Sequence, residues 1–219
     1  MVYSNGPSIV RDGLVLHLDA ADRNSYPGSG STWYDLSGNN NHATLVTTPT
    51  IIQDNKGGIS FNDTTDYGTF NSYIILNDFT IESVSSCKYA YSALFGNGSN
   101  IYYEYLRLDC APDGGRVIFI VGNGTQASFA GATDNLFNFC DTIKHFIIRR
   151  QGSNLSLYIN NELLSTKSVS TNAFNINRLC RGNNNYGNQD LFFARIYNKA
   201  LSSEEISQNF EATKGRFGL

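Results

Sequence analysis

Residues 13–43, GLVLHLDAADRNSYPGSGSTWYDLSGNNNHA, form the stretch that decides the fold. Its opening segment, Leu14–Leu18, is apolar at alternate positions, which predicts a β-strand with one buried face. We expect the three leucines to face the core, so that His17 points outward as a structural histidine. A polar turn region follows, and Trp33, the only tryptophan, is predicted to pack beneath the loop that comes after it.

The composition favours an all-β domain. Of the 219 residues, 41% are hydrophobic and 16% are charged, and glycine, tyrosine and phenylalanine are frequent. A net charge of -3 and the lack of a lysine or arginine run predict that the protein does not bind nucleic acid. No stretch is long and apolar enough to cross a bilayer, and the N-terminus lacks a signal-peptide pattern.

Short runs of β-branched and aromatic residues recur between turns rich in glycine and asparagine. Asn160-Asn161 lies between two such runs and is expected to form a hairpin turn with positive φ. No βαβ rhythm and no internal repeat is present, which predicts an antiparallel sandwich. The predicted strands cover residues 14–18, 42–46, 59–61, 79–84, 89–95, 101–109, 116–121, 127–130, 143–150, 155–159, 162–164, 173–179 and 191–197.

The end of the chain predicts one short helix. Ser202 is followed three residues later by Glu205, which is the spacing of a capping box, and Leu201 and Ile206 are placed for a hydrophobic staple around it. Gly215 is expected to stop the helix. We predict one domain, made of an N-terminal arm at 1–12, a sandwich at 13–200, and a C-terminal helix and tail at 201–219 packed on the same domain.

The four cysteines are far apart and none belongs to a CxxC motif. Because zinc sites need clustered ligands, we predict none. The lack of an export signal favours reduced, buried thiols that act as small hydrophobic side chains, and disulfide bonds are the alternative. The cysteines are Cys87, Cys110, Cys140 and Cys180.

Six segments resemble, in this order, a LamG-like, concanavalin A-like jelly-roll domain: GLVLHLDA, WYDLSGNNNHAT, ISFNDTTDY, FTIES, LSLYINNELL and RIYNKALSSEEISQNF. The resemblance covers nearly the whole chain and implies two antiparallel sheets packed face to face. The opening pattern of LDA, YPGSG and W-x-DLSG, and the ending QNFEATKGRFGL, are similar to the version of this domain in tailed-bacteriophage virion proteins. The fold implies no single activity, because it carries lectins, hydrolases and structural modules.

Glycoside hydrolases of the family that the chain resembles carry a strand motif ExDxE or ExDxxE, which places two carboxylates on one face beside the glycosidic bond. Glu82 and Glu104 are the glutamates on predicted strands, and neither has an acid two residues later. Asp109 lies five residues after Glu104 and would face the opposite side of a regular strand. We therefore predict no catalytic residues and a protein that is not an enzyme.

The resemblance also implies a structural calcium site, because some LamG-like domains bind calcium through loop oxygens. Asp35 and Asn39 of the DLSGN segment carry over to that site, and Asp66 is a further oxygen donor in a turn. The alternative is an Asx turn, in which Asp35 bonds its own backbone. The absence of a dense ligand string of the EF-hand type favours the Asx turn.

A sugar site needs an aromatic platform with amide or carboxylate groups nearby. Tyr102, Tyr103 and Tyr105 on one predicted strand, with Asn184 and Tyr186 in the loop at 182–188, are the predicted glycan-binding residues. The alternative is that the tyrosines pack between strands and the asparagines form a plain solvated loop.

These features predict a non-enzymatic structural protein of a tailed-phage virion, as a capsid decoration or fibre component, that contacts host-surface glycans. We expect it to be made in the host cytoplasm and to form a homo-oligomer in the particle. Contacts with other virion proteins are expected through Met1–Arg11 or Lys214–Leu219, without nucleic acid or membrane insertion. The alternatives are a free carbohydrate-binding lectin module and a glycoside hydrolase whose carboxylate pair is assembled by folding.

Overall fold

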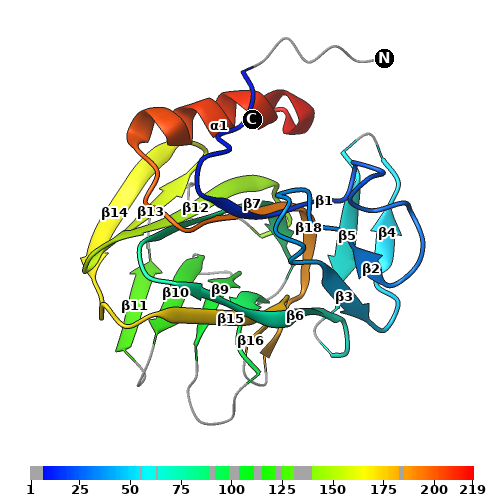
Figure 1. Cartoon of the computed structure of the whole chain (residues 1–219), viewed down its shortest axis with the longest axis horizontal. Helices are drawn as coiled ribbons and strands as arrows, with labels where there is room; N and C mark the ends of the chain where they lie inside the picture. The colour runs from blue at the N-terminus through cyan, green and yellow to red at the C-terminus, as the bar shows by residue number, and fades with distance from the viewer. Residues whose placement is uncertain are drawn as a thin grey trace.

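The chain folds as two antiparallel β-sheets packed face to face, with one helix against the outside of the first sheet (Figure 1). The predicted all-β jelly-roll sandwich with one short C-terminal helix is confirmed. The computed structural model describes residues 7–54, 56–62, 64–88, 92–98, 104–110, 115–121, 125–130, 140–182 and 185–219.

Each of the two sheets contains eight strands. Sheet A contains, in spatial order, β14 (Glu162–Ser168), β13 (Asn154–Ile159), β12 (Lys144–Gln151), β7 (Phe79–Cys87), β18 (Gln189–Tyr197), β5 (Gly58–Phe61) and β4 (Thr50–Ile52), and β1 (Leu14–Asp19) also pairs with β18. Sheet B contains β11 (Thr125–Ala130), β10 (Arg116–Val121), β9 (Tyr105–Asp109), β8 (Ser92–Gly96), β15 (Phe174–Leu179), β6 (Tyr67–Leu76), β3 (Ala43–Val46) and β2 (Thr32–Trp33). A small hairpin of β16 (Arg181–Gly182) and β17 (Asn185–Tyr186) forms a separate two-stranded sheet.

The core lies between the two sheets, where the inward residues of alternating strands meet. Phe79 of sheet A contacts Phe119 and Phe174 of sheet B, with ring centroids 5.8 and 6.0 Å away. Trp33 is fully buried and packs edge-on against Tyr26 at 6.5 Å, as expected of an anchor. Burying these large rings removes much apolar surface from water, which is the main stabilising term of the sandwich.

The first strand follows its predicted pattern with one difference. Leu16 and Leu18 face the core between the sheets, but Leu14 belongs to a second apolar cluster under the helix. A register shift between Leu14 and Leu16, in the pairing of β1 with β18, accounts for the change of face. His17 points outward as predicted, yet it is only 8% exposed.

Helix α1 (Ser203–Phe217) begins as the sequence predicts and ends later. Ser202 is the N-cap, and the capping box with Glu205 is present in both directions. Gly215 does not stop the helix. Gly218 takes the left-handed conformation at φ 71° and donates its backbone N–H to Lys214 O, so the chain leaves the helix there. In the described part of the chain, no helix is long and apolar enough to cross a membrane.

Helix α1 covers part of the outer face of sheet A (Figure 1). Ile206 packs with Ile147 and Tyr158, and Phe217 packs with Val84 and Phe193. Two apolar clusters therefore lie outside the sandwich core, and the helix is their cover.

One turn prediction is confirmed, and one long strand was not predicted. Asn160 and Asn161 have φ angles of 49° and 68° in the hairpin between β13 and β14. No strand was predicted over residues 67–76, where the ten-residue strand β6 occupies the middle of sheet B. Asn71-Ser72 interrupts its alternation, and the register between β6 and β15 shifts nearby.

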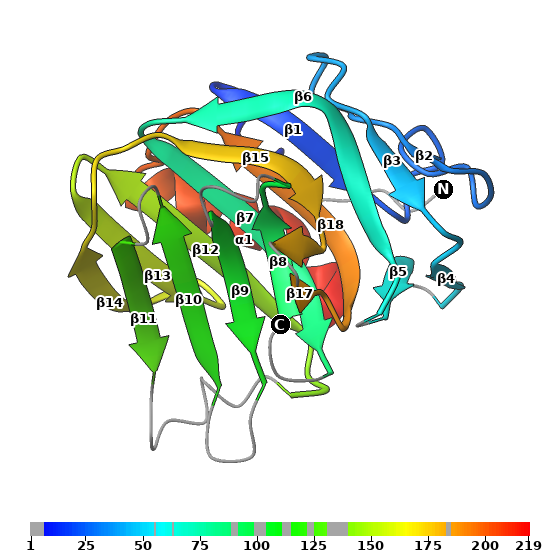
Figure 2. The same ribbon diagram turned by 90° about the horizontal axis from the view of Figure 1, so that it is seen from below.

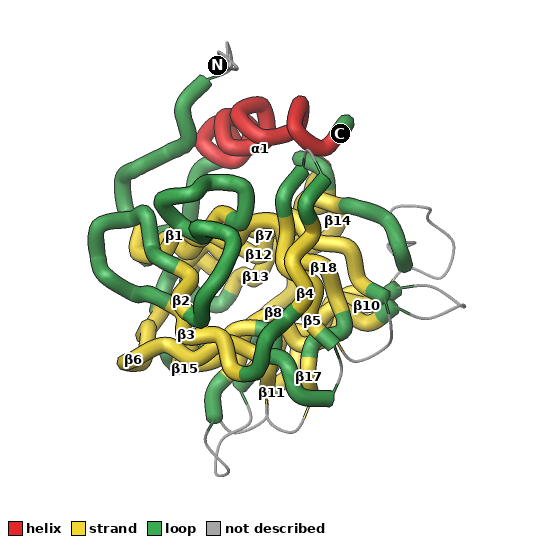
Figure 3. Tube along the Cα trace, turned by 90° about the vertical axis from the view of Figure 1, so that its right-hand side faces the viewer, coloured by secondary structure: helices red, strands yellow, loops and turns green. Residues whose placement is uncertain are grey.

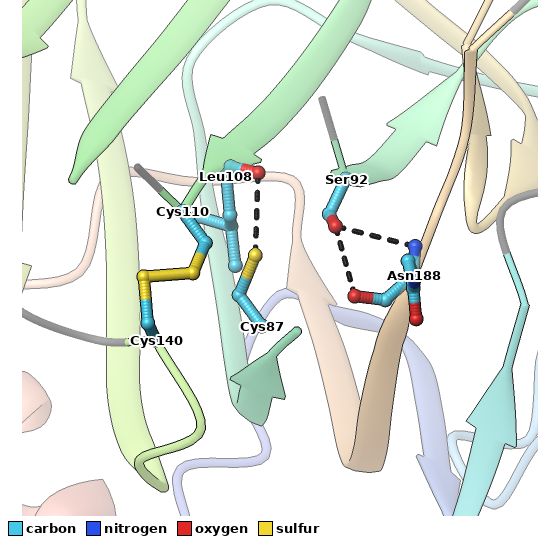
Figure 4. The surroundings of a disulfide bond; sticks show 6 residues. All are labelled: Cys87, Ser92, Leu108, Cys110, Cys140 and Asn188. Carbon is cyan, nitrogen blue, oxygen red and sulfur yellow. Dashed lines mark hydrogen bonds between the residues drawn. A yellow bond between two sulfur atoms is a disulfide. The ribbon is translucent and has the colours of Figure 1, made fainter. Parts of the chain in front are cut away.

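The expectation that all four cysteines are reduced is wrong for two of them. Cys110 and Cys140 form a disulfide with their Cα atoms 5.1 Å apart (Figure 4). Folding brings the end of β9 beside the segment that leads into β12, and a separation of 30 residues along the chain gave no sign of this. Cys87 and Cys180 are buried thiols, as predicted, and burial raises the pKa of Cys180.

Candidate functional site

A half-buried group of two tyrosines and two arginines lies on the outer face of sheet B. We call it the Tyr–Arg cluster: Tyr67 of β6, Arg178 of β15, Arg181 of β16 and Tyr186 of β17. The two tyrosine rings meet edge to face with centroids 5.9 Å apart. The Arg181 guanidinium carbon lies 4.6 Å from the Tyr67 centroid and 4.7 Å from that of Tyr186, so both rings share one cation.

Two glycines allow the hairpin of β16 and β17 to lie against sheet B. A Cβ at Gly182 would come within 2.5 Å of Tyr105 Cβ, and one at Gly96 within 2.6 Å of Gly182 Cα. Only residues without a side chain permit this approach. The hairpin thereby sets Arg181 and Tyr186 beside β8, which Figure 2 shows from below next to β17.

The two arginines of the cluster lack polar partners within the described part of the chain. Arg178 lies 5.5 Å from the Tyr67 centroid and close against Gly98, where a Cβ would meet its Nη2 at 2.8 Å. Neither Arg178 nor Arg181 donates a hydrogen bond or forms an ion pair there, and Arg178 Nε is buried. The cluster thus offers guanidinium donors beside aromatic faces, which is a combination that suits a polar ring-shaped ligand.

The predicted glycan residues divide into two groups. Tyr186 lies in the cluster, and Tyr105 contacts the hairpin that carries it through Gly182. The Arg107 guanidinium carbon lies 5.4 Å from the Tyr105 ring. The other three predicted residues, Tyr102, Tyr103 and Asn184, lie outside the described residues.

Sequence reasoning missed three members of the cluster, namely Tyr67, Arg178 and Arg181. A usable signal was present in RLCRGNNNYG, where two arginines three residues apart precede the asparagine run in a chain with few charges. Tyr67 gave no such signal, because it reaches the cluster only through the pairing of β6 with β15.

Glu82, one of the two candidate carboxylates, lies under α1 in a buried polar network. Its Oε1 accepts hydrogen bonds from His145 Nε2 at 2.8 Å and Arg195 Nη1 at 3.0 Å, and its Oε2 accepts from Asn209 Nδ2 at 2.8 Å. Glu82 is completely buried. Burial alone would raise the pKa of Glu82, but Arg195 and the hydrogen bonds from His145 and Asn209 outweigh it, so that this pKa lies below its usual value.

The same network, which we call the Glu82 network, ties the N-terminal arm to the helix. Asn209 Oδ1 accepts from the backbone N–H of Val10 at 2.8 Å, and its Nδ2 also donates to the Tyr197 hydroxyl at 2.9 Å. The Tyr197 hydroxyl donates to Val10 O at 3.2 Å. These contacts give Glu82 a structural setting in which no substrate could reach it without removal of α1.

Glu104, the second candidate carboxylate, is 3% exposed and lies beside the start of β9. It accepts hydrogen bonds from Asn97 Nδ2 at 3.0 Å and from the Asn175 backbone N–H at 2.9 Å. These contacts tie Glu104 to the segment after β8 and to strand β15, so they stabilise the local chain path in sheet B.

The loop at 35–41 is organised by Asp35 as an Asx turn. Asp35 Oδ1 accepts from the backbone N–H groups of His17 and Ser37, each at 2.8 Å, and Oδ2 accepts from Ser37 Oγ at 2.7 Å and Asn41 N at 3.0 Å. Asn39 Nδ2 donates to Leu14 O at 3.1 Å. These bonds fit the Asx-turn alternative, and calcium binding by Asp35 and Asn39 stays a prediction. Asp66 accepts from Thr47 Oγ1 and, at 3.3 Å, from Asn62 N.

A cavity of about 530 Å³ lies between the loop after β1 and the β4–β5 hairpin. Figure 3 shows these loops in green beside β4 and β5. Tyr26, Ile51 and Ile52 form apolar parts of its wall, and Arg23 and Asp54 add opposite charges. It shares no lining residue with the Tyr–Arg cluster, so the two can be tested separately.

Comparison with solved structures finds a similar fold in a mosquitocidal-protein binding domain, a botulinum neurotoxin and a sialidase. The binding domain of Paraclostridial Mosquitocidal Protein 1 is 16% identical, with a TM-score of 0.63, and 91% of this chain covers 52% of it. Botulinum neurotoxin type C, whose cell entry depends on two ganglioside molecules, is 14% identical with a TM-score of 0.62, and 93% of this chain covers 52% of it. Trypanosoma rangeli sialidase in complex with sialic acid is 15% identical with a TM-score of 0.60, and 93% of this chain covers 33% of it.

The chain spans about half the length of the two toxin structures and a third of the sialidase. At these identities the likeness shows the fold alone. No curated protein matches the sequence. The profile of the concanavalin A-like lectin/glucanases superfamily, of the laminin G type, matches residues 62–207, which is more than half of the chain. Together with the two-sheet jelly roll, this match shows that the chain belongs to the concanavalin A-like lectin/glucanase superfamily.

Proposed function

We propose that this domain binds carbohydrate without catalysis, through the Tyr–Arg cluster on the outer face of sheet B. The observation that carries the proposal is the arrangement of Tyr67 and Tyr186 around Arg181, with centroids 4.6 and 4.7 Å from its guanidinium carbon. Aromatic faces bind the apolar side of a sugar ring, and guanidinium groups bind its oxygens. Family membership and the ganglioside-dependent toxin among the similar structures add support.

The placement of the two candidate glutamates supports a non-catalytic role. A glycosidase needs two accessible carboxylates that flank the scissile bond. Glu82 is fully buried and bonded to Arg195, His145 and Asn209. Glu104 is almost as buried and holds Asn97 and Asn175.

A glycan array followed by titration calorimetry tests the proposal. Tyr186→Ala and Tyr67→Ala should each weaken binding of the best glycan at least tenfold, because stacking on the ring is lost. Tyr34→Ala is the matched control, since Tyr34 is 43% exposed in a loop away from the cluster. An array without hits at millimolar glycan, or equal losses in all three variants, would reject carbohydrate binding at this site.

We further propose that the domain acts as a component of a tailed-phage particle, either a capsid decoration or a fibre part, and that it forms a homo-oligomer there. The support is the likeness of its opening and ending segments to phage virion proteins. Mass spectrometry and cryo-EM of purified particles test this setting. Many symmetric copies on the head indicate decoration, a few copies at the tail indicate adhesion, and absence from particles removes the virion role and leaves a free lectin.

Deleting Met1–Arg11 or Lys214–Leu219 is a poor test of virion attachment. Val10 is buried and bonds to Asn209 and Tyr197, and Phe217 is buried against Phe192 and Phe193. Loss of either segment would damage the fold itself. Copy number in the intact particle is therefore the more direct measurement.

A further inference from the structure

The Tyr–Arg cluster contains two guanidinium groups that bond to no carboxylate among the residues that the structure describes. Arg178 and Arg181 have no hydrogen-bond or ion-pair partner in the described part of the chain. The carboxylate next to Tyr67 in the sequence, Asp66, accepts from Thr47 Oγ1 and Asn62 N. Arg107 in the same sheet differs from these two arginines, because it forms an ion pair in which its Nε lies 2.6 Å from Asp109 Oδ1.

The contacts of these two arginines with rings leave their hydrogen-bonding capacity unused. A cation–π contact engages the positive charge and consumes no N–H donor. Arg181 lies between Tyr67 and Tyr186, and Arg178 lies between Tyr67 and Gly98. Each side chain is thus held in position by ring and backbone contacts that use none of its N–H donors, although Arg178 Nε itself is buried, and this reduces the ordering cost of binding an anion.

We infer that the cluster selects acidic sugars, with the paired guanidiniums of Arg178 and Arg181 binding a carboxylate or sulfate group while Tyr67 and Tyr186 contact the ring. This inference rests on the proposed carbohydrate-binding function and specifies its ligand. Guanidinium groups bind the planar carboxylate, and two oxygens of the tetrahedral sulfate group, through two parallel N–H bonds. The positive charge is local, because the chain as a whole carries a net charge of -3.

Matched probes separate the acidic group from the sugar ring. Lactose, sialyllactose and a sulfated lactose share one neutral core and differ in charge. We expect sialyllactose or sulfated lactose to bind at least tenfold more tightly than lactose, and the preferred one of the two identifies the anionic group. Raising sodium chloride from about 0.05 to 0.5 M should weaken binding of the acidic probe and leave that of lactose unchanged, since salt screens exposed charges.

Variants assign the preference to the two arginines. Arg178→Ala and Arg181→Ala should each reduce binding of the acidic probe at least tenfold, whereas Arg181→Lys should recover only part of it because the two-pronged geometry is lost. Arg23→Ala is the control, since Arg23 is an exposed arginine that lines the separate 530 Å³ cavity. Unfolding midpoints in urea show that each variant is folded, and Arg178→Gln or Arg181→Gln replaces the alanine variant at the same position if that one is not.

The outcomes distinguish this inference from the function on which it rests. Tight binding of lactose that Tyr186→Ala abolishes and Arg181→Ala leaves intact would overturn the acidic preference and retain carbohydrate binding. A loss of acidic-probe binding in Arg23→Ala alone would move the site to the cavity and overturn the inference. No binding of any glycan would reject the proposed function itself.

Discussion

The outer faces of the two sheets carry similar polar side chains in opposite circumstances. Under α1, on sheet A, the buried Glu82 accepts hydrogen bonds from the buried Arg195, from His145 and from Asn209. On sheet B, Arg178 and Arg181 are partly exposed and contact tyrosine rings. Arginine near an aromatic ring occurs in both, since the Arg195 guanidinium carbon lies 4.1 Å from the Phe193 centroid.

The two faces differ in whether the arginine charge has a bonded partner among the described residues: Arg195 pairs with Glu82, and Arg178 and Arg181 have no such partner. A buried charge is tolerated only when it is paired and hydrogen-bonded, so the Glu82 network serves to hold the helix, the sheet and the N-terminal arm together. A half-exposed charge without a partner contributes little to folding and remains available to a ligand. Substitutions on sheet A should therefore change stability, and those on sheet B should change binding.

The largest effect is expected from breaking the Glu82 network. Glu82→Gln should lower the free energy of unfolding by about 3–5 kcal/mol, because Arg195 is left buried without its counter-charge. Urea unfolding monitored by fluorescence of Trp33 measures the change. Glu162→Gln, at an exposed position on β14, is the matched control with little expected effect. A loss below about 1 kcal/mol for Glu82→Gln would contradict the structural role that we give the network.

Removal of the disulfide is expected to give the second largest loss of stability. This bond joins the end of β9 in sheet B to the segment before β12 in sheet A. Replacing Cys110 and Cys140 by serine should reduce the free energy of unfolding by roughly 3–4 kcal/mol, as expected for a closed loop of about this length. The same midpoint shift should appear when the wild-type protein is reduced. Equal midpoints with and without reductant would show that the bond does not form or does not constrain the unfolded chain.

Acid should lower the free energy of unfolding, because groups on the outer side of sheet A titrate. His17 is buried, and the loss of water around it, followed by the charge of Arg195, lowers its pKa from 6.5 to about 4. The unfolded chain therefore takes up a proton near pH 6.5 while the folded protein does not, so stability falls as the pH drops from about 6.5 to 4, by about 3 kcal/mol in total.

Glu82 adds to the acid effect below its ordinary pKa of 4.5, because its folded pKa is lower and the unfolded state again binds the proton first. Unfolding curves between about pH 7 and 3 measure both contributions. His17→Gln removes the titrating ring and should flatten the curve between pH 6.5 and 5. An unchanged slope in that variant would assign the pH dependence to other groups.

The smallest stability effect is expected on sheet B. Arg181→Ala should change the free energy of unfolding by less than about 1 kcal/mol, the size of a partly exposed cation–π contact. Arg195→Ala is the matched arginine from sheet A and should cost about 3 kcal/mol or more, because Glu82 then lacks its ion pair. Similar losses in the two variants would remove the distinction between the two faces.

The parts of the fold that sequence could predict are those with local causes. The alternation of Leu14–Leu18, the positive-φ asparagines at Asn160 and Asn161, and the capping box of Ser202 with Glu205 all act over a few residues. Strand β6 was not predicted, because Asn71-Ser72 in its middle is a pair typical of turns and the strands that pair with β6 cannot be identified from local sequence.

The candidate site was predictable only in part, because strand pairing assembles it. Tyr186 was predicted from its place beside the asparagine run. Tyr67 comes from a strand more than a hundred residues earlier and contacts Tyr186 only in the folded protein. The disulfide had the same difficulty, since nothing in the spacing of Cys110 and Cys140 indicates that their Cα atoms lie 5.1 Å apart. Contacts of this kind depend on register and crossover, which local patterns do not encode.

The helix α1 and the Tyr–Arg cluster lie on opposite sides of the domain, the helix on sheet A and the cluster on sheet B. The described chain starts beside the helix and ends with it, so both ends leave from the covered face of sheet A (Figure 1). A tether, a surface or a fused protein attached at either end would therefore lie next to the helix-covered face of sheet A. Sheet B and its hairpin would then face outward in every copy of an array, with the same orientation and without steric competition from the anchor.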